Sequence, residues 1–220
     1  MEINDNIFHR QLDILSPEDV FEDVGLIGAG GIGSPTALVL LKMGLPSIKV
    51  WDFDTVELHN LPNQLYTKKD VGKKKVDALF INLLDFQFDG QDVEVFDKKW
   101  DGTMTEILIC TVDSMDMRIE LWKQIKENPE CNVYIDARMG GELMKIYTIN
   151  PNDPSHIEFY EKTLYTSEEA NELPCTARSI FYNCFVIAGL IGSLVKKHIK
   201  GEDIPKEIIF DLKTYGFLKT

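Results

Sequence analysis

Residues 24–60 read VGLIGAGGIGSPTALVLLKMGLPSIKVWDFDTVELHN, and this stretch decides the fold. Its centre is a turn that holds four glycines: Gly28, Gly30, Gly31 and Gly33. An apolar run of strand length precedes the turn, and an apolar run of helix length follows it. The stretch therefore predicts two strands, over 24–27 and 47–51, on either side of a helix over 33–43.

The glycine turn satisfies the pattern G-x-G-x-x-G, which is typical of nucleotide-binding loops. The first glycine permits a tight turn, the second lets backbone N–H groups approach phosphates, and the third lets the helix pack closely on the strand. Asp52 ends the second strand about 20 residues further on, where a carboxylate accepts hydrogen bonds from ribose hydroxyls. These features favour a nucleotide site, but they do not separate a nicotinamide cofactor from ATP.

The rest of the chain continues the alternation of strands and helices. Further helices are predicted over 70–86, 114–126 and 177–199, and further strands over 92–96, 106–112, 133–136, 143–149 and 207–212. Such alternation predicts an α/β fold with a Rossmann-like, doubly wound and mostly parallel sheet. The glycine pair Gly140–Gly141 introduces an antiparallel hairpin, so the C-terminal part of the sheet is expected to be antiparallel. We expect one domain over 1–220, with an N-terminal arm over 1–23 and a surface crossover loop over 150–176.

Charge and hydropathy exclude several classes of partner. The 220 residues include 36 acidic and only 23 basic ones, a net charge of −13. Because phosphate backbones and anionic lipids repel such a chain, neither nucleic acid nor a membrane surface is an expected partner. The polar start MEINDNIFHRQ does not resemble a signal peptide, and the most apolar stretch is shorter than a membrane span. We therefore expect a cytoplasmic protein.

Residues downstream of Asp52 favour ATP over a nicotinamide cofactor. Hydride transfer needs neither a lysine at the phosphates nor a carboxylate that holds a metal ion, whereas nucleotidyl transfer uses both. Lys75 starts a predicted helix and Asp113 follows a predicted strand. Both positions lie beyond the carboxyl ends of strands, which is where open α/β sheets bind ligands.

The ordered motifs of the chain resemble those of the ThiF/MoeB/HesA family of adenylating enzymes. The resemblance covers residues 8–150 well and the helix over 177–199 more loosely. It implies an adenylyltransferase that uses ATP and Mg²⁺ to activate the C-terminal carboxylate of a small ubiquitin-like or sulfur-carrier protein, releasing pyrophosphate. It also implies a homodimer.

The resemblance assigns roles to individual residues. GAGGIG is similar to the phosphate loop, Asp52 to the ribose-binding acid, and Asp54 to the second acid of D-x-D. Asn60, Asn63 and Gln64 match the N-x-x-R-Q stretch at the triphosphate. Lys75 matches the phosphate lysine and Asp113 the magnesium ligand. Arg10 resembles the arginine that family dimers insert into the neighbouring ATP site.

The chain departs from the family pattern at three points. Asn63 replaces the arginine of N-x-x-R-Q and removes a positive charge, which Lys73 or Lys74 could compensate. The paired CxxC zinc site is absent from the sequence, so the resemblance is to a short member without zinc. Ser114 replaces the asparagine after the magnesium-binding aspartate. The lost arginine leaves open a catalytically weak nucleotide-binding module, and an NAD-dependent oxidoreductase is the other alternative.

Cys175 is the candidate for a thioester-forming cysteine. It precedes a predicted helix, and a helix N-terminus lowers the pKa of a thiol. The alternative is a small apolar core residue, which is the role expected of Cys110, Cys131 and Cys184. Arg118 either braces the site or forms a surface ion pair, and Arg138 either approaches the acyl-adenylate or stabilises the hairpin.

Overall fold

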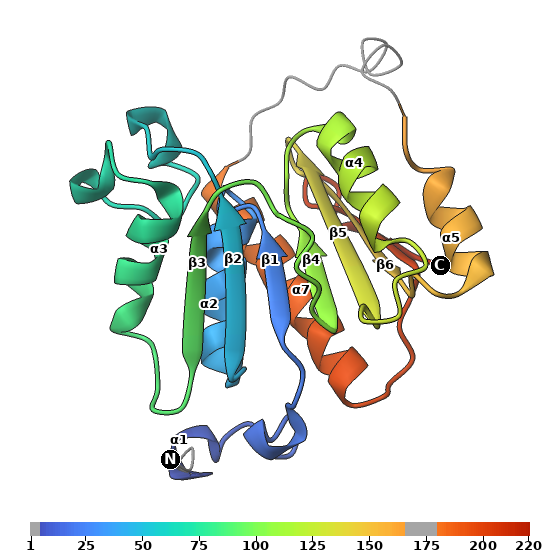
Figure 1. Cartoon of the computed structure of the whole chain (residues 1–220), viewed down its shortest axis with the longest axis horizontal. Coiled ribbons are helices and arrows are strands. Elements are labelled where there is room, and N and C mark those ends of the chain that lie inside the picture. The colour runs from blue at the N-terminus through green and yellow to red at the C-terminus, as the bar shows by residue number, and fades with distance from the viewer. Residues whose placement is uncertain (1–4, 166–179) are drawn as a thin grey trace.

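The structure, a computed structural model, describes residues 5–165 and 180–220 (Figure 1). Within these residues eight strands form one sheet in the order β3-β2-β1-β4-β5-β6-β7-β8. The strands are β1 Val24–Ile27, β2 Ser47–Asp52, β3 Asp92–Asp97, β4 Ile107–Cys110, β5 Val133–Gly140, β6 Leu143–Ile149, β7 Glu207–Asp211 and β8 Gly216–Lys219. Strands β1 to β5 run parallel, and β6 to β8 add antiparallel pairs. The predicted mixed sheet is therefore confirmed.

Helices cover both faces of this sheet (Figure 1). They are α2 Gly33–Met43, α3 Lys75–Leu84, α4 Met115–Ile125, α5 Pro154–Glu161 and α7 Phe181–Ile199, whereas α1 Asp5–Phe8 lies beyond one end of the sheet. One apolar core joins α2, α3 and α7 to one face of the sheet, and a second core joins α4 and α5 to the other. No helix in the described part of the chain is long and apolar enough to cross a membrane.

The order of the parallel strands positions the glycine turn. Successive residues of β1 alternate between the two cores, with Leu26 in the first and Ile27 in the second, so the strand is apolar throughout. Its neighbours are β2 on one side and β4 on the other. The chain therefore reverses its winding direction at β1, and the crevice beyond the carboxyl ends of β1 and β4 is the expected ligand site of such a sheet.

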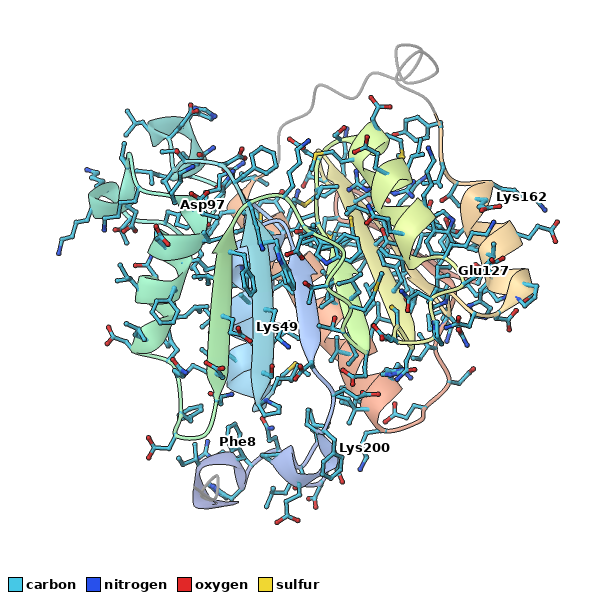
Figure 2. All side chains as sticks on the ribbon, in the orientation of Figure 1. Phe8, Lys49, Asp97, Glu127, Lys162 and Lys200 are labelled. Atoms are coloured by element: carbon cyan, nitrogen blue, oxygen red, sulfur yellow. The ribbon has the colours of Figure 1, made fainter. Side chains whose placement is uncertain are left out.

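The N-terminal arm packs at the opposite end of the sheet from the glycine turn. Phe8 is buried, and its ring meets that of Phe88 edge-on with centroids 5.2 Å apart (Figure 2). The Gln11 Nε2 donates to the Met43 carbonyl at the last residue of α2, 2.7 Å away. Beyond the arm, Ser16 caps a short 3₁₀ helix over Pro17–Asp19.

The predicted loop over 150–176 contains a helix that we did not expect. Helix α5 occupies Pro154–Glu161, and the Asp153 carboxylate caps it by accepting from the backbone N–H groups of Ser155 and His156. Proline at the first helical position is itself a helix-start signal. Ile157 and Tyr160 bury one side of α5 against the sheet. The prediction of a loop was therefore wrong over these residues.

Other elements also differ from the sequence prediction. Helix α3 starts at Lys75 instead of residue 70, because Gly72 turns the chain with a φ of 87°. Val71, inside the predicted helix, lies before its start and is 43% exposed. Strand β8 was not predicted. The helix expected over 177–199 is described from Phe181 onward, and it ends at Ile199 as predicted.

Candidate functional site

The glycine turn joins β1 to α2 as the sequence pattern predicts. Gly28 has a φ of 103°, and its N–H donates to the Trp51 carbonyl at 2.8 Å. A Cβ at Gly33 would lie 1.9 Å from the Gly28 carbonyl oxygen, so only glycine lets α2 approach the turn this closely. A Cβ at Gly30 would meet nothing within 4 Å. Gly30 borders the open cleft, and its backbone is accessible to a ligand there.

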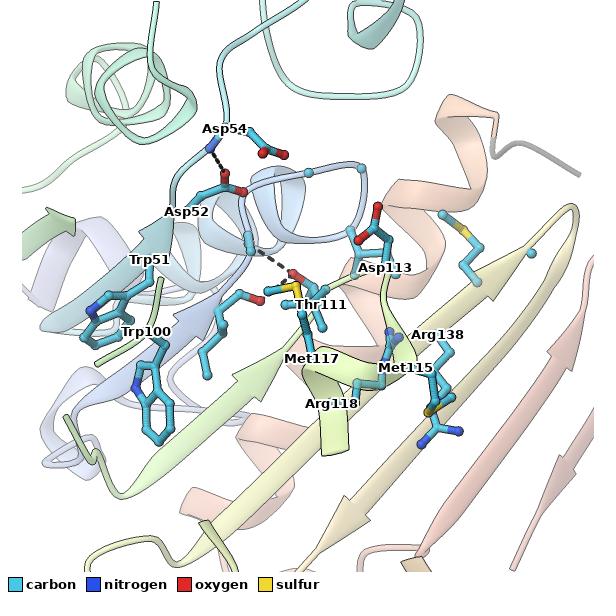
Figure 3. A pocket seen from close by; sticks show the side chains of 18 of the residues that line it. Trp51, Asp52, Asp54, Trp100, Thr111, Asp113, Met115, Met117, Arg118 and Arg138 are labelled. Atoms are coloured by element: carbon cyan, nitrogen blue, oxygen red, sulfur yellow. Dashed lines mark hydrogen bonds between the residues drawn. The ribbon is translucent and has the colours of Figure 1, made fainter. Parts of the chain in front are cut away.

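A cleft of about 1570 Å³ lies beyond the carboxyl ends of the parallel strands (Figure 3). Every nucleotide-site residue predicted at this edge lines it: Gly28, Gly30, Gly31, Asp52, Asp54, Asn60, Asn63, Gln64, Lys75 and Asp113. Gly33 lies behind the turn, where it supports the packing of α2. Pockets for small ligands usually measure about 300–1000 Å³. The cleft is therefore larger than a usual small-ligand pocket.

Asp52 organises the base of the cleft. Its Oδ2 accepts the N–H of Ala29 in the glycine turn at 2.7 Å. Its Oδ1 accepts the N–H of Asp54 at 2.8 Å, as Figure 3 shows. A carboxylate has about four lone-pair positions, so both oxygens keep capacity for a ligand hydroxyl. The tip of β2 is thus fixed to the glycine turn through a group that can still accept hydrogen bonds.

Lys75 forms the cationic wall of the cleft. It is 7% exposed, and its Nζ lies 2.7 Å from the Asp54 Oδ2. The Lys75 N–H also donates to the Asp54 carbonyl at 2.9 Å, so the start of α3 is tied to the segment after β2. The Asp54 side chain is 52% exposed, which leaves the ion pair open to the cleft. An anionic ligand can therefore compete with Asp54 for Lys75.

The end of β4 is locked to the glycine turn. The Thr111 Oγ1 donates to the carbonyl oxygens of Ile27 and Gly28, at 3.1 and 3.0 Å. Asp113 follows two residues later, exposed to the cleft, and Ser114 caps α4. The described residues contain no cluster of three His, Cys, Asp or Glu side chains that could hold a metal ion alone. A cation at Asp113 would need ligands from substrate phosphates, which is how Mg²⁺ commonly binds.

The segment over 58–64 contributes three amide residues to the cleft, Asn60, Asn63 and Gln64, and their contacts differ. The Asn60 Oδ1 accepts the Glu57 N–H at 2.8 Å and fixes the 3₁₀ helix Leu58–Asn60. The Asn63 carbonyl oxygen lies 3.2 Å from the Cys184 Sγ. The Gln64 Oε1 is buried and has no hydrogen-bond partner within 5–165 and 180–220. The Gln64 side chain therefore brings an acceptor oxygen to the cleft that the described residues leave unused.

Neither lysine considered as a substitute for the lost arginine reaches the cleft. Lys73 pairs with Asp70 at 3.1 Å, and Lys74 pairs with Asp97 at 3.1 Å. Both side chains are absent from the cleft lining. The suggestion that one of them compensates for Asn63 is therefore wrong for this arrangement of the chain.

Sequence reasoning missed an aromatic and basic wall contributed by β2 and by the segment after β3. Trp51 stacks on Phe96 with ring centroids 4.9 Å apart, and Trp100 lies beside it (Figure 3). Lys98 and Lys99 complete this side of the cleft. The available signal was the position of Lys98–Trp100 directly after a predicted strand, at the same edge as Asp52.

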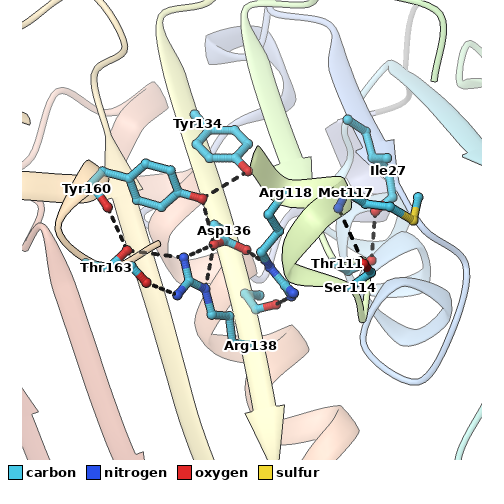
Figure 4. A network of polar contacts seen from close by, with 11 residues as sticks. Ile27, Thr111, Ser114, Met117, Arg118, Tyr134, Asp136, Arg138, Tyr160 and Thr163 are labelled. Carbon is cyan, nitrogen blue, oxygen red and sulfur yellow. Dashed lines mark hydrogen bonds and ion pairs between the residues drawn. The ribbon is translucent and has the colours of Figure 1, made fainter. Parts of the chain in front are cut away.

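A buried polar network closes the other side of the cleft (Figure 4). Asp136 lies between two arginines, with its Oδ1 2.9 Å from the Arg118 Nε and its Oδ2 2.7 Å from Arg138. Tyr160 donates to the Asp136 Oδ2 at 2.8 Å. Burial alone raises the pKa of Asp136, but the two guanidinium groups outweigh it and lower that pKa below its usual value. Asp136 is therefore a fully buried carboxylate anion.

The two arginines connect separate elements. The Arg118 Nη2 donates to the Ala137 carbonyl at 3.2 Å, which joins α4 to β5. Because Arg118 is 5% exposed, the expectation of a surface ion pair was wrong. Arg138 donates to the Thr163 carbonyl and hydroxyl oxygens and packs on the Tyr147 ring. It therefore holds the segment after α5 against the cleft.

The remaining candidates lie away from the cleft or outside the described residues. Arg10 is exposed in the N-terminal arm, at the opposite end of the sheet, and does not contribute to the cleft of its own chain. Cys175 falls outside the described residues. Cys110, Cys131 and Cys184 are fully buried, which confirms their expected core role. Burial raises the pKa of Cys110 and raises that of Cys131 to about 12, so both remain thiols.

Comparison with known protein families agrees with this site. The profile described as the ThiF family matches residues 20–217. The chain belongs to the ThiF family. The match spans the parallel strands, the polar network and the antiparallel strands up to β8. The predicted family resemblance is confirmed.

Relatives of known name match parts of this ThiF-family chain. Ubiquitin-like modifier-activating enzyme 5 of Aedes aegypti is 30% identical over 129 residues, which cover 50% of this chain and 31% of the relative. Adenylyltransferase and sulfurtransferase uba4 of Neosartorya fischeri is 39% identical over 87 residues, covering 39% of this chain and 17% of the relative. The matched part is thus a third or less of each relative's length.

Solved structures share the whole fold at low sequence identity. PaaA superposes with a TM-score of 0.78 at 19% identity, covering 100% of this chain and 75% of that one. The Escherichia coli protein MccB, crystallised with ATP, superposes with a TM-score of 0.76 at 19% identity, covering 100% and 72%. At this identity the likeness establishes the architecture alone.

Proposed function

We propose that this ThiF-family chain uses ATP to adenylate the C-terminal carboxylate of a small ubiquitin-like or sulfur-carrier protein in the cytoplasm. One observation carries the proposal: the glycine turn, Asp52, Lys75 and Asp113 all line one cleft at the point where the sheet reverses its winding. Relatives named as a ubiquitin-like modifier-activating enzyme and as an adenylyltransferase support the same reaction class.

ATP fits the residues of the nucleotide side of the cleft. The backbone at Gly30 is open to the cleft, and the N-terminus of α2 adds partial positive charge for phosphates. Asp52 keeps acceptor positions for ribose hydroxyls. Trp51 and Trp100 border this side of the cleft as core side chains, 1% and 7% exposed, so they shape its wall. The structure of MccB with ATP supports ATP as the nucleotide.

Asp113 is the proposed ligand of Mg²⁺, with phosphate oxygens completing the coordination. Its carboxylate is exposed to the cleft beside the glycine turn, which suits an ion shared between protein and substrate. The ion would neutralise phosphate charge. Lys75 supplies a second positive charge from the opposite wall once it exchanges Asp54 for a phosphate.

The reaction proposed is an in-line displacement at the α-phosphorus of ATP. A carboxylate oxygen of the carrier forms a bond to this phosphorus, the bond from phosphorus to the bridging oxygen breaks, and pyrophosphate leaves with the electron pair. The carboxylate is already ionised at neutral pH, so no general base is needed. The chain contributes positioning and charge stabilisation, which dominate phosphoryl-transfer catalysis.

One chain lacks the cation that the family pattern places at the triphosphate. Asn63 stands where the family has arginine, and Lys73 and Lys74 pair with carboxylates elsewhere. Arg10 lies at the far end of its own chain, exposed and available to a second copy. We therefore propose a homodimer in which each Arg10 serves the neighbouring site.

A thioester step on Cys175 is the optional second half of the proposal. The thiolate would attack the acyl carbon of the adenylate and release AMP. A carrier conjugate that dithiothreitol cleaves, and that Cys175→Ala abolishes, is the expected result. Persistence of the conjugate in Cys175→Ala would remove this cysteine from the mechanism.

Exchange of labelled pyrophosphate into ATP tests the adenylation directly. The assay uses the full chain with small proteins that end in Gly-Gly. We expect exchange in the wild type and its loss in Asp113→Ala. Glu120→Ala is the matched control, because Glu120 is an exposed acid on α4 outside the cleft. Undiminished exchange in Asp113→Ala would overturn the metal assignment.

Two alternatives give different results in simpler assays. An NAD-dependent oxidoreductase would be stabilised against heat by NAD more than by MgATP. A catalytically weak nucleotide-binding module, which Asn63 and the Lys75–Asp54 pair favour, would bind ATP without exchanging pyrophosphate with any carrier.

A further inference from the structure

The cleft extends beyond the nucleotide side into a second region, which we name the far arm. It is formed by the end of β5, the start of β6 and the segment after α5: Met139, Gly140, Leu143, Lys145, Tyr147, Lys162, Thr163 and Tyr165. The sequence motifs gave none of these positions a ligand-binding role. The far arm is the part of the cleft where a substrate tail would lie while its terminus reaches the nucleotide. Its role therefore rests on the proposed adenylation.

Two cations face one another across the strands of the far arm. Arg138 on β5 stands directly opposite Lys145 on β6 in the antiparallel register. Side chains of directly opposed residues lie on the same face about 4.5–5.5 Å apart at Cβ, and like charges there are unfavourable. Asp136 and Thr163 occupy the Arg138 guanidinium. These groups do not neutralise the positive charge of Lys145.

Lys145 has no hydrogen-bond or ion-pair partner within residues 5–165 and 180–220. The residue paired with it on β7 is the apolar Ile209. The nearest acids of β7 stand two residues from Ile209 on either side. Glu207 is opposite Tyr147 in the register, and Asp211 accepts from Lys213 and Thr214. Lys145 is thus a half-buried cation that lines the cleft.

The other lysine of the far arm differs from Lys145. Lys162 lies on the outer flank beyond α5 (Figure 2). It pairs with Glu158 at 2.7 Å, and both side chains are more than two-thirds exposed, at 71% and 74%. Such a pair contributes little and is screened by salt. Lys145 is therefore the group in this region that gains most from an incoming carboxylate.

We propose that the far arm selects a substrate whose C-terminal tail carries an aspartate or glutamate upstream of the reacting terminus, and that Lys145 pairs with this side chain. The surroundings suit an extended tail, because the Leu143 side chain is 40% exposed beside Lys145 and offers apolar contact. The chain as a whole carries a charge of −13, so its surface outside the cleft does not favour an acidic tail in general. A tail with a lysine at the same place meets repulsion.

Binding of labelled peptides tests the far arm without requiring catalysis. The probes are fluorescent C-terminal peptides ending in Gly-Gly, with Glu, Gln or Lys placed in turn at each upstream position. Affinity is measured by anisotropy with the full chain and a non-hydrolysable ATP analogue. We expect one position at which Glu binds about tenfold more tightly than Gln, equal to about 1.4 kcal/mol. Lys145→Gln should remove the discrimination, and Lys145→Glu should reverse it toward Lys.

The controls separate this inference from the proposed adenylation. Lys123→Glu changes an exposed lysine outside the cleft by the same charge and should keep the preference for Glu. Equal binding of all three peptides at every position, or no binding of any peptide, would overturn the far-arm inference. Pyrophosphate exchange with a carrier is scored independently, so its absence counts against the adenylation alone.

Discussion

The two sides of the cleft use charge in opposite ways. On the nucleotide side, Asp52, Lys75 and Asp113 stand at strand and helix ends, and each remains open to the cleft. On the antiparallel side, Asp136 is fully buried between Arg118 and Arg138. Charged residues at similar positions in the sheet therefore have different roles. The first group is available to a ligand, and the second holds α4, β5 and the segment after α5 together.

The contrast is clearest between the two ion pairs that border the cleft. Lys75 and Asp54 are 2.7 Å apart, but half of the Asp54 side chain meets solvent, so a ligand can replace either partner. The Asp136 pairs have similar lengths with no exposure of the carboxylate. Breaking a buried pair leaves an uncompensated charge in the core, whereas breaking an exposed pair costs little.

Asp136→Asn should produce the largest loss of stability. It leaves two buried guanidinium groups without a counter-ion, and we expect the free energy of unfolding to fall by about 3–5 kcal/mol. Urea unfolding at neutral pH measures the change. Asp113→Asn is the matched control on the nucleotide side and should change stability by about 0.5 kcal/mol or less. Equal losses of unfolding free energy in the two variants would contradict the proposed difference between structural and ligand-binding charges.

Gly33→Ala should produce the second-largest loss of stability. Its Cβ would lie 1.9 Å from the Gly28 carbonyl oxygen, so the turn must move away from α2. Overpacking of this kind costs about 1–3 kcal/mol, and we expect ATP affinity to fall with it. In Gly30→Ala the new Cβ meets nothing within 4 Å, so stability should be retained while ATP binding weakens. Denaturation and calorimetry on the two variants separate packing from ligand contact.

Asp70→Asn should change the acid dependence of stability. Burial raises the pKa of Asp70, but hydrogen bonds from Asn82, Thr67 and Lys73 outweigh it and lower that pKa to about 2. A lowered carboxyl pKa contributes stability that is present above about pH 4 and is lost as the pH falls toward 2. The variant should therefore lose stability at neutral pH and show a flatter decline between pH 4 and 2. Urea midpoints across that range provide the measurement, and parallel curves would contradict the assignment.

Asp54→Asn should have the smallest effect on stability. The Asp54–Lys75 pair is partly exposed, and such pairs contribute about 0–1 kcal/mol. Because the variant frees Lys75 for phosphate, ATP binding should be retained or tightened. Lys75→Gln should likewise leave the fold intact but weaken ATP binding. If Lys75→Gln does not fold, Lys75 has a structural role, like Asp136 and its two arginines, and the prediction is wrong.

The sequence predicted the nucleotide side well because its features are local. Glycine spacing, the strand and helix around it and the acid at the tip of β2 follow from neighbouring residues. Lys75 and Asp113 follow from their places at element ends. All of these positions except Gly33 line the cleft as expected.

The antiparallel side was predicted poorly because its features depend on distant contacts. Arg118 and Asp136 are 18 residues apart on different elements, and nothing in their local sequence marks them as partners. Helix α5 has only 8 residues, too few for a clear periodic pattern, although Asp153–Pro154 signals its start. That Lys145 has no charged partner among the described residues becomes visible only once its neighbours across β5 and β7 are known.

Equilibrium binding of nucleotide to the full chain tests the central claim most directly. Calorimetric titration with MgATP and with NAD should show saturable binding of MgATP alone. Asp52→Asn replaces the proposed ribose acceptor and should weaken MgATP binding about tenfold, since hydrogen bonds to charged groups contribute about 1.5–3 kcal/mol. Tighter binding of NAD than of MgATP, or unchanged MgATP affinity in Asp52→Asn, would contradict the account.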